Sequence, residues 1–140
     1  MNQLPSIKID EAVALFIGTS SRLGQAYRTL RAEWLPDSPP TTLVFSSLGR
    51  SICRSIESDP DEEKILLWST VENLMERGDE AVKNALATGL LEAVLSAASG
   101  GLSITSITSI TSITRHFGPT TMAYCRAWDE FTGCTTDGIS

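Results

Sequence analysis

The sequence predicts an all-α protein, a compact bundle of five to six short amphipathic helices in antiparallel hairpins, with HEAT-like packing as one option. Apolar residues recur at helical spacing in most segments between the proline- and glycine-containing turns. Outside residues 103–114, no stretch alternates convincingly between apolar and polar residues as a half-buried strand would. A length of 140 residues suits a single domain, which we place at 1–132, followed by a frayed tail at 133–140.

Three helices are expected in the first half of the chain. Two acids open the segment 9–17, where the helix dipole favours negative charge. The segment 20–35 has apolar residues at i, i+4, i+7 and i+11, and the following PDSPP must end that helix because proline has no amide donor. A third helix over roughly 41–57 has Thr41 or Thr42 as its expected N-cap.

The second half of the chain predicts further helices. One over 60–77 is expected to be capped by Asp59, with Pro60 at its first position. The next, over 80–98, follows an Arg-Gly-Asp turn in which Asp79 is the expected N-cap. A last helix begins after a Gly-Pro pair. The predicted core is formed by the apolar residues on the inner faces of all these helices: Leu23, Tyr27, Leu30, Trp34, Phe45, Leu48, Ile52, Leu67, Val71, Leu74, Leu86, Leu90, Val94, Tyr124, Trp128 and Phe131.

Residues 103–114 read SITSITSITSIT, a tripeptide repeat that fits neither secondary structure well. In a strand, successive isoleucines would point to opposite faces, and in a helix the stripe would drift around the circumference. Four repeats are too few to bury a solenoid core. A threonine array for ordered water and a kinase-target strip are functional alternatives. We expect an insertion before the last helix that lengthens either a helix or a loop, and not a site.

The composition indicates a reducing cytoplasm. The N-terminal segment lacks a basic patch followed by an apolar stretch, so we expect no signal peptide. No window of eighteen or more residues is free of charged and strongly polar groups, which excludes a transmembrane helix. The three cysteines show neither a CxxC motif nor metal-ligand spacing, and two of them lie inside helical patterns, where a free thiol behaves as a small hydrophobe.

No motif assigns a reaction, a cofactor or a metal ion. GxGxxG, Walker, HExxH and GxSxG patterns are absent from the sequence. The single histidine, His116, is expected to be a turn or surface residue, and its pairing with a carboxylate is the enzymatic alternative. The serine-rich GTSSRLG could hold an anion, but a capping turn through Thr19 or Ser20 is the expected structure. We therefore predict a protein that is not an enzyme.

Negative charge is concentrated in one quarter of the chain. Residues 57–92 carry ten acidic side chains against three basic ones, a balance of −7, while the whole chain has a net charge of −6. Such a field repels nucleic acid and attracts a basic protein surface. Glu72 and Glu76 lie one turn apart without the histidines of a di-metal site. A solvated helix face is the alternative to a partner-binding surface formed by Glu57, Asp59, Asp61, Glu62, Glu63, Glu72, Glu76, Asp79 and Glu80.

A resemblance to a known family rests on two stretches, WSTVENLMERGDEAVKNALATGLLEAVL (68–95) and FGPTTMAYCRAWDEFTG (117–133). The features that carry it are a helix that ends in a Gly-Asp turn, a helix with small residues before Leu-Glu-Ala, and a late Gly-Pro followed by an aromatic helix. In these features the chain resembles a family of small all-helical bacterial immunity-type proteins found beside polymorphic and contact-delivered toxins. The resemblance implies an antitoxin-like role, the tight binding of one cognate toxin domain in the cytoplasm, and carries no catalytic residues.

The predicted function is that of an immunity protein that neutralises a basic, nuclease-like toxin domain through its acidic face. Nucleic acid and membranes are not expected as partners, and the sequence leaves monomer and homodimer open. The alternative is a helical adaptor or self-assembling protein that recognises a peptide or partner through an apolar groove. Salt distinguishes the two, because screening weakens charge-driven docking and hardly affects apolar contact.

Overall fold

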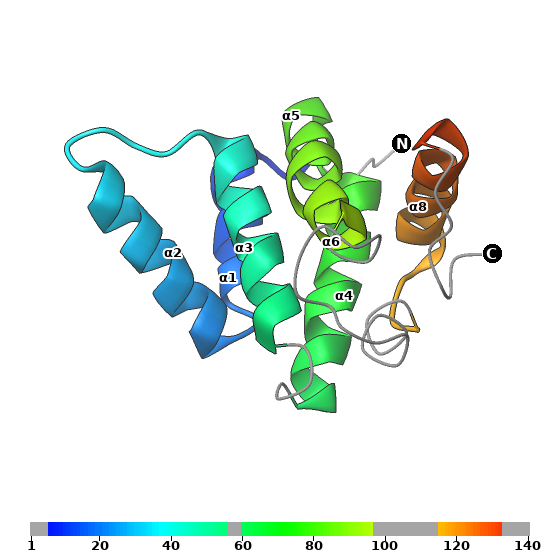
Figure 1. The fold of residues 1–140 in the computed structure, drawn as a ribbon, viewed down its shortest axis with the longest axis horizontal. Helices are drawn as coiled ribbons and strands as arrows, with labels where there is room; N and C mark the ends of the chain where they lie inside the picture. The colour runs from blue at the N-terminus through cyan, green and yellow to red at the C-terminus, as the bar shows by residue number, and fades with distance from the viewer. Residues whose placement is uncertain (1–5, 56–59, 97–114, 133–140) are drawn as a thin grey trace.

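The computed structural model describes residues 6–55, 60–96 and 115–132, and within them it confirms an all-α bundle. The first four helices run in alternating directions (Figure 1). The only extended pairing in the described ranges is an isolated bridge between Ile7 and Gly78. In chain order the elements are α1 (Ile9–Ile17), α2 (Ser21–Trp34), α3 (Thr41–Ser55), α4 (Asp61–Arg77), α5 (Glu80–Ala85), the π-helix η1 (Leu86–Leu91), α6 (Glu92–Ser96) and α8 (Pro119–Thr132).

Several predictions fall on residues outside these ranges. They concern the SIT run, the acids Glu57 and Asp59, and the tail at 133–140. HEAT-like packing stays a prediction. None of the described helices is long and apolar enough to cross a membrane.

Side chains cap two of the helices as predicted. The Ser20 hydroxyl accepts a hydrogen bond from the Leu23 amide at the start of α2 (3.3 Å). The Asp79 carboxylate accepts one from the Val82 amide at the start of α5 (2.9 Å). The predicted cap at Thr41 or Thr42 is wrong. Helix α3 already contains both residues, because its first turn is closed by the carbonyl of the preceding proline.

The core lies where α1, α3, α4 and η1 meet. Phe16 and Phe45 are fully buried and pack edge to face, with ring centroids 5.4 Å apart. Helix α3 lies between α2 and the α5–η1–α6 run (Figure 1). Most predicted core residues are buried or packed against this cluster. The side chain of Phe131 lies outside the description, and Trp128 packs on a small second cluster formed by Leu95 and Cys125.

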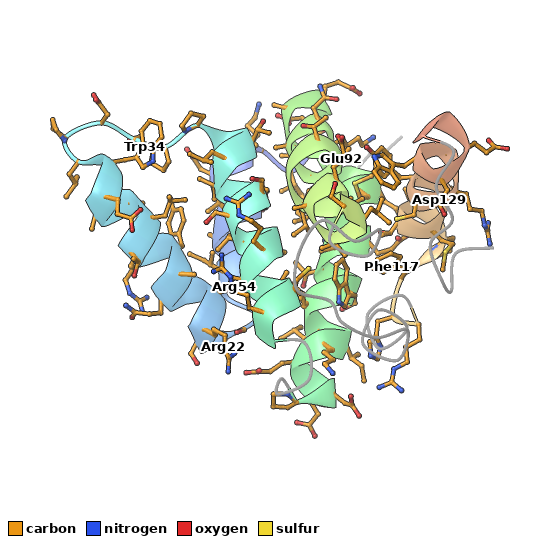
Figure 2. The ribbon with its side chains drawn as sticks, in the orientation of Figure 1. Arg22, Trp34, Arg54, Glu92, Phe117 and Asp129 are labelled. Carbon is orange, nitrogen blue, oxygen red and sulfur yellow. The ribbon has the colours of Figure 1, made fainter. Side chains whose placement is uncertain are left out.

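Trp34 was predicted to be in the core and is exposed. Burial decreases along α2, from Leu23 at 3% exposed, through the half-buried Tyr27 and Leu30, to Trp34 at 37% exposed. The cause is the direction of α2, which leaves the body at its C-terminal end, where Trp34 lies beside the loop to α3 (Figure 2). An apolar stripe shows which face of a helix turns inward, but not how far the neighbouring helix extends beneath it.

The predicted helix over 80–98 is interrupted by a π-helical segment, η1, and its residues 97–98 lie outside the description. A π turn holds more residues than an α turn, so adjacent side chains can face inward together. Leu90 and Leu91 are both fully buried. Gly89 faces α3 so closely that a Cβ atom there would lie 2.7 Å from the Thr42 carbonyl oxygen and 2.9 Å from the Phe45 Cβ. Glycine at this position therefore sets the spacing between η1 and α3.

Helix α8 packs on α4 and η1. The rings of Trp68 and Phe117 lie 4.8 Å apart between their centroids. The Tyr124 hydroxyl donates a hydrogen bond to the Ala87 carbonyl inside the π segment (3.3 Å). These contacts attach the last helix to the side of α4 that the first three helices leave open.

Candidate functional site

The solvent-facing side of α4 exposes large apolar side chains. Leu67, Trp68, Val71 and Leu74 point into the core, so the helical period turns the opposite side of α4 to solvent. Ile65 and Leu66 are 55% and 50% exposed. They are adjacent apolar side chains exposed on one helix, as Trp34 (37%) and Leu35 (67%) are at the end of α2.

Acidic residues flank this apolar pair on the same side of the helix. Glu62 and Glu76 are both exposed, and they lie fourteen residues apart, or about 21 Å along the helix axis. The polar residues between them include Ser69 and Asn73. We call this surface the α4 outer face and define it by six residues: Glu62, Ile65, Leu66, Ser69, Asn73 and Glu76.

Four more of the predicted acids lie near the two ends of α4. At its start, Asp61 forms an ion pair with Arg115 (3.0 Å) and lies 4.0 Å from the Lys64 ammonium, and Glu63 is half-buried. Just beyond its end, the Asp79 carboxylate caps α5 and Glu80 is exposed. Of these four acids, Asp61 and Asp79 therefore already have partners within the described part of the chain.

Glu72 holds the N-terminus of α8. Its two carboxylate oxygens accept hydrogen bonds from the Thr120 amide (2.8 Å), the Thr121 amide (2.9 Å) and the Thr121 hydroxyl (2.8 Å). The first amides of a helix have no partner within the helix, and its dipole favours an anion there. The carboxylate thus caps a helix 48 residues further along the chain.

The hydrogen bonds give Glu72 an unusual acidity. Burial acts to raise its pKa, but the bonds from the amides and hydroxyls of Thr121 and Thr120 outweigh it and lower the pKa from 4.5 to about 2. Gly118 makes room for this arrangement, because a Cβ atom there would lie only 2.5 Å from the Glu72 Cγ. One signal of this role is visible in the sequence: the Gly-Pro-Thr-Thr start of the last helix has no acidic residue of its own in the first turn.

His116 lies beside the ion pair at the start of α4. Its Nε2 accepts a hydrogen bond from the Arg115 side chain (3.3 Å). Burial lowers the pKa of His116, and the nearby Arg115 and Lys64 lower it further, while Asp61 opposes them. Asp61, the carboxylate that acts on His116, is already paired with Arg115.

Two of the cysteines are buried free thiols. Burial raises the pKa of Cys53 to about 11 and that of Cys125 to about 12, with Asp129 adding to the second shift. Both groups stay protonated near neutral pH, where a thiol is a poor nucleophile.

Across the described parts of the chain, no three His, Cys, Asp or Glu side chains gather in a way that could hold a metal ion. The comparisons with other proteins add no assignment: no protein-family model matches the chain, and no curated protein or solved structure is significantly similar to it.

Proposed function

We propose that this protein is an immunity protein without enzymatic activity, which binds and neutralises a cationic bacterial toxin domain through the α4 outer face. The observation that carries the proposal is the exposed pair Ile65 and Leu66 between the exposed acids Glu62 and Glu76. The resemblance of residues 68–95 and 117–133 to immunity-type proteins supports the same role.

The chemistry of the face suits this task. Protein interfaces combine an apolar centre, which supplies affinity when it is removed from water, with a polar rim. Carboxylates at the rim speed the approach of a basic partner and reject acidic ones. A nuclease-like toxin is basic where it holds its substrate, so an acidic inhibitor can occupy that surface.

The test compares two double variants of equal charge change. Glu62→Lys/Glu76→Lys reverses the rim of the α4 outer face, and Glu11→Lys/Glu33→Lys reverses two exposed acids on α1 and α2. Each is co-expressed with the product of the adjacent upstream gene, and binding and host protection are measured. We expect the first variant to bind at least about tenfold more weakly and to lose protection, and the second to behave like the native protein.

A first variant that binds and protects as well as the native protein would contradict the proposal. Neither double variant changes Glu72, because this residue caps α8. Reversing its charge would remove the cap of α8 and weaken the fold whether or not the residue touches a partner.

The alternative is an adaptor or self-assembling protein whose partner covers the same apolar pair without using the acids. The exposure of Ile65 and Leu66 favours this function equally. It differs in its dependence on charge: both double variants would then bind alike, and Leu66→Ala would weaken binding more than either.

A further inference from the structure

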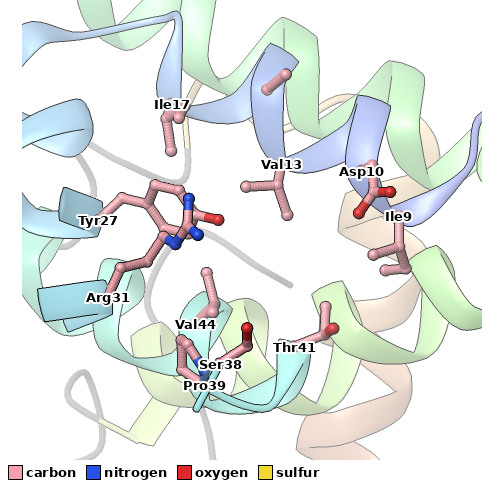
Figure 3. A pocket seen from close by; sticks show the side chains of 11 residues that line it. Ile9, Asp10, Val13, Ile17, Tyr27, Arg31, Ser38, Pro39, Thr41 and Val44 are labelled. Atoms are coloured by element: carbon pink, nitrogen blue, oxygen red, sulfur yellow. The ribbon is translucent and has the colours of Figure 1, made fainter. Parts of the chain in front are cut away.

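A pocket of about 440 Å³ lies between α1, α2, α3 and the loop that enters α3 (Figure 3). It exists because α2 leaves the body toward its C-terminal end. Val13 and Ile17 from α1 and Val44 from α3 form an apolar wall. The volume lies within the range of pockets that hold small molecules.

Charged groups stand at opposite sides of the pocket. The Arg31 guanidinium lies over the ring of Tyr27, 5.8 Å from its centroid, and both side chains reach into the pocket from α2. Asp10 lies across from them on α1 (Figure 3). Among the described residues, no carboxylate lies within ion-pair distance of Arg31.

We propose that this pocket binds a small apolar monocarboxylate, separately from the docking face on α4. The carboxylate would pair with Arg31, whose planar group matches two carboxylate oxygens and is held in place by the Tyr27 ring. The apolar stem would lie against Val13, Ile17 and Val44. Asp10 disfavours a second anionic group at the far side, which selects a monocarboxylate over a dicarboxylate.

The test uses three probes of similar length: hexanoate, its neutral amide hexanamide, and the dicarboxylate adipate. Each is titrated into the full-length protein while amide NMR shifts are followed at Val13, Ile17 and Val44. We expect hexanoate to saturate these shifts at about millimolar concentration and to bind at least about tenfold more tightly than hexanamide. Adipate is expected to bind more weakly than hexanoate.

Two variants assign the effect to one side chain. Arg31→Gln should reduce hexanoate binding to the level of hexanamide. Arg28→Gln is the matched control, since Arg28 lies on the same helix, bonds to Gln25 (3.0 Å) and does not line the pocket. Both positions are exposed, and thermal melting checks that each variant is folded.

Equal affinity for hexanoate and hexanamide would overturn the proposal. So would the absence of saturable shifts at the pocket residues, or an equal loss in both arginine variants. Binding of adipate as tight as that of hexanoate would reject the monocarboxylate class. None of these results tests the α4 outer face, because none of its six residues lines the pocket.

Discussion

A single carboxylate caps the start of the last helix. Glu72 replaces the hydrogen bonds that the first amides of α8 cannot make within their own helix, and the buried Thr121 hydroxyl joins them. From sequence, Glu72 and Glu76 look equivalent, because both are acids on α4. The structure separates them: Glu72 is half-buried and bonded, and Glu76 is exposed.

We predict that Glu72→Gln lowers the free energy of unfolding by about 1–3 kcal/mol, since bonds to a charged acceptor become bonds to a neutral amide. Glu76→Gln, one turn further along, should change it by less than about 0.5 kcal/mol. Urea denaturation of both variants at neutral pH measures the difference. Equal effects would contradict the capping role of Glu72.

The cost of Glu72→Gln should also depend on pH. The pKa of Glu72 is about 2 in the folded protein and near 4.5 when the chain unfolds. The unfolded state therefore binds more protons between these values, and the contribution of the carboxylate to stability increases with pH there. It is fully present above about pH 4.5 and is lost as pH falls through about 2. The stability difference between native protein and variant should shrink across this window.

At the scale of elements, the contact between η1 and α3 depends on close backbone approach. The π segment brings Gly89 against Thr42 and Phe45, at distances that leave no room for a methyl group. Adding atoms to a packed interface forces neighbours out of their preferred positions. Helix α3 would have to move, and with it the centre of the core.

We predict that Gly89→Ala lowers the free energy of unfolding by about 1–3 kcal/mol. The matched control is Gly24→Ala within α2, where the new Cβ atom would meet only ordinary contacts, 3.4 Å from the Arg28 side chain and 3.8 Å from the Ile17 carbonyl. Because alanine has a higher helix propensity than glycine, the free energy of unfolding of that variant should be unchanged or higher by up to about 1 kcal/mol. Chemical denaturation of both checks the prediction, which fails if Gly89→Ala is as stable as Gly24→Ala.

At the scale of the molecule, α4 separates acids that are close in sequence. Glu62 and Glu76 lie toward opposite ends of one exposed helix face, while Asp61, Glu72 and Asp79 are engaged within the chain. The α4 outer face therefore contains fewer acids than the charge balance suggested, and it contains an apolar pair that charge counting could not reveal.

We predict that association with a cationic partner through this face slows by at least about tenfold between low salt and about 0.5 M salt. The dissociation rate should change less, because the contacts of Ile65 and Leu66 are apolar. Stopped-flow mixing with the purified product of the adjacent gene measures both rates. A salt-independent association rate would favour the adaptor alternative.

Local patterns were sufficient to predict the helices. Periodic apolar residues, the caps at Ser20 and Asp79, and the turns at proline and glycine act over a few residues, so the chain alone determined the α-helical fold and most of its core. Only the tertiary structure decided that Trp34 is exposed, that Glu72 caps α8, and that Ile65 and Leu66 remain in water. Each of these depends on how far a neighbouring helix extends or on a contact between segments that are distant in sequence. Helical periodicity describes one helix at a time and predicts neither.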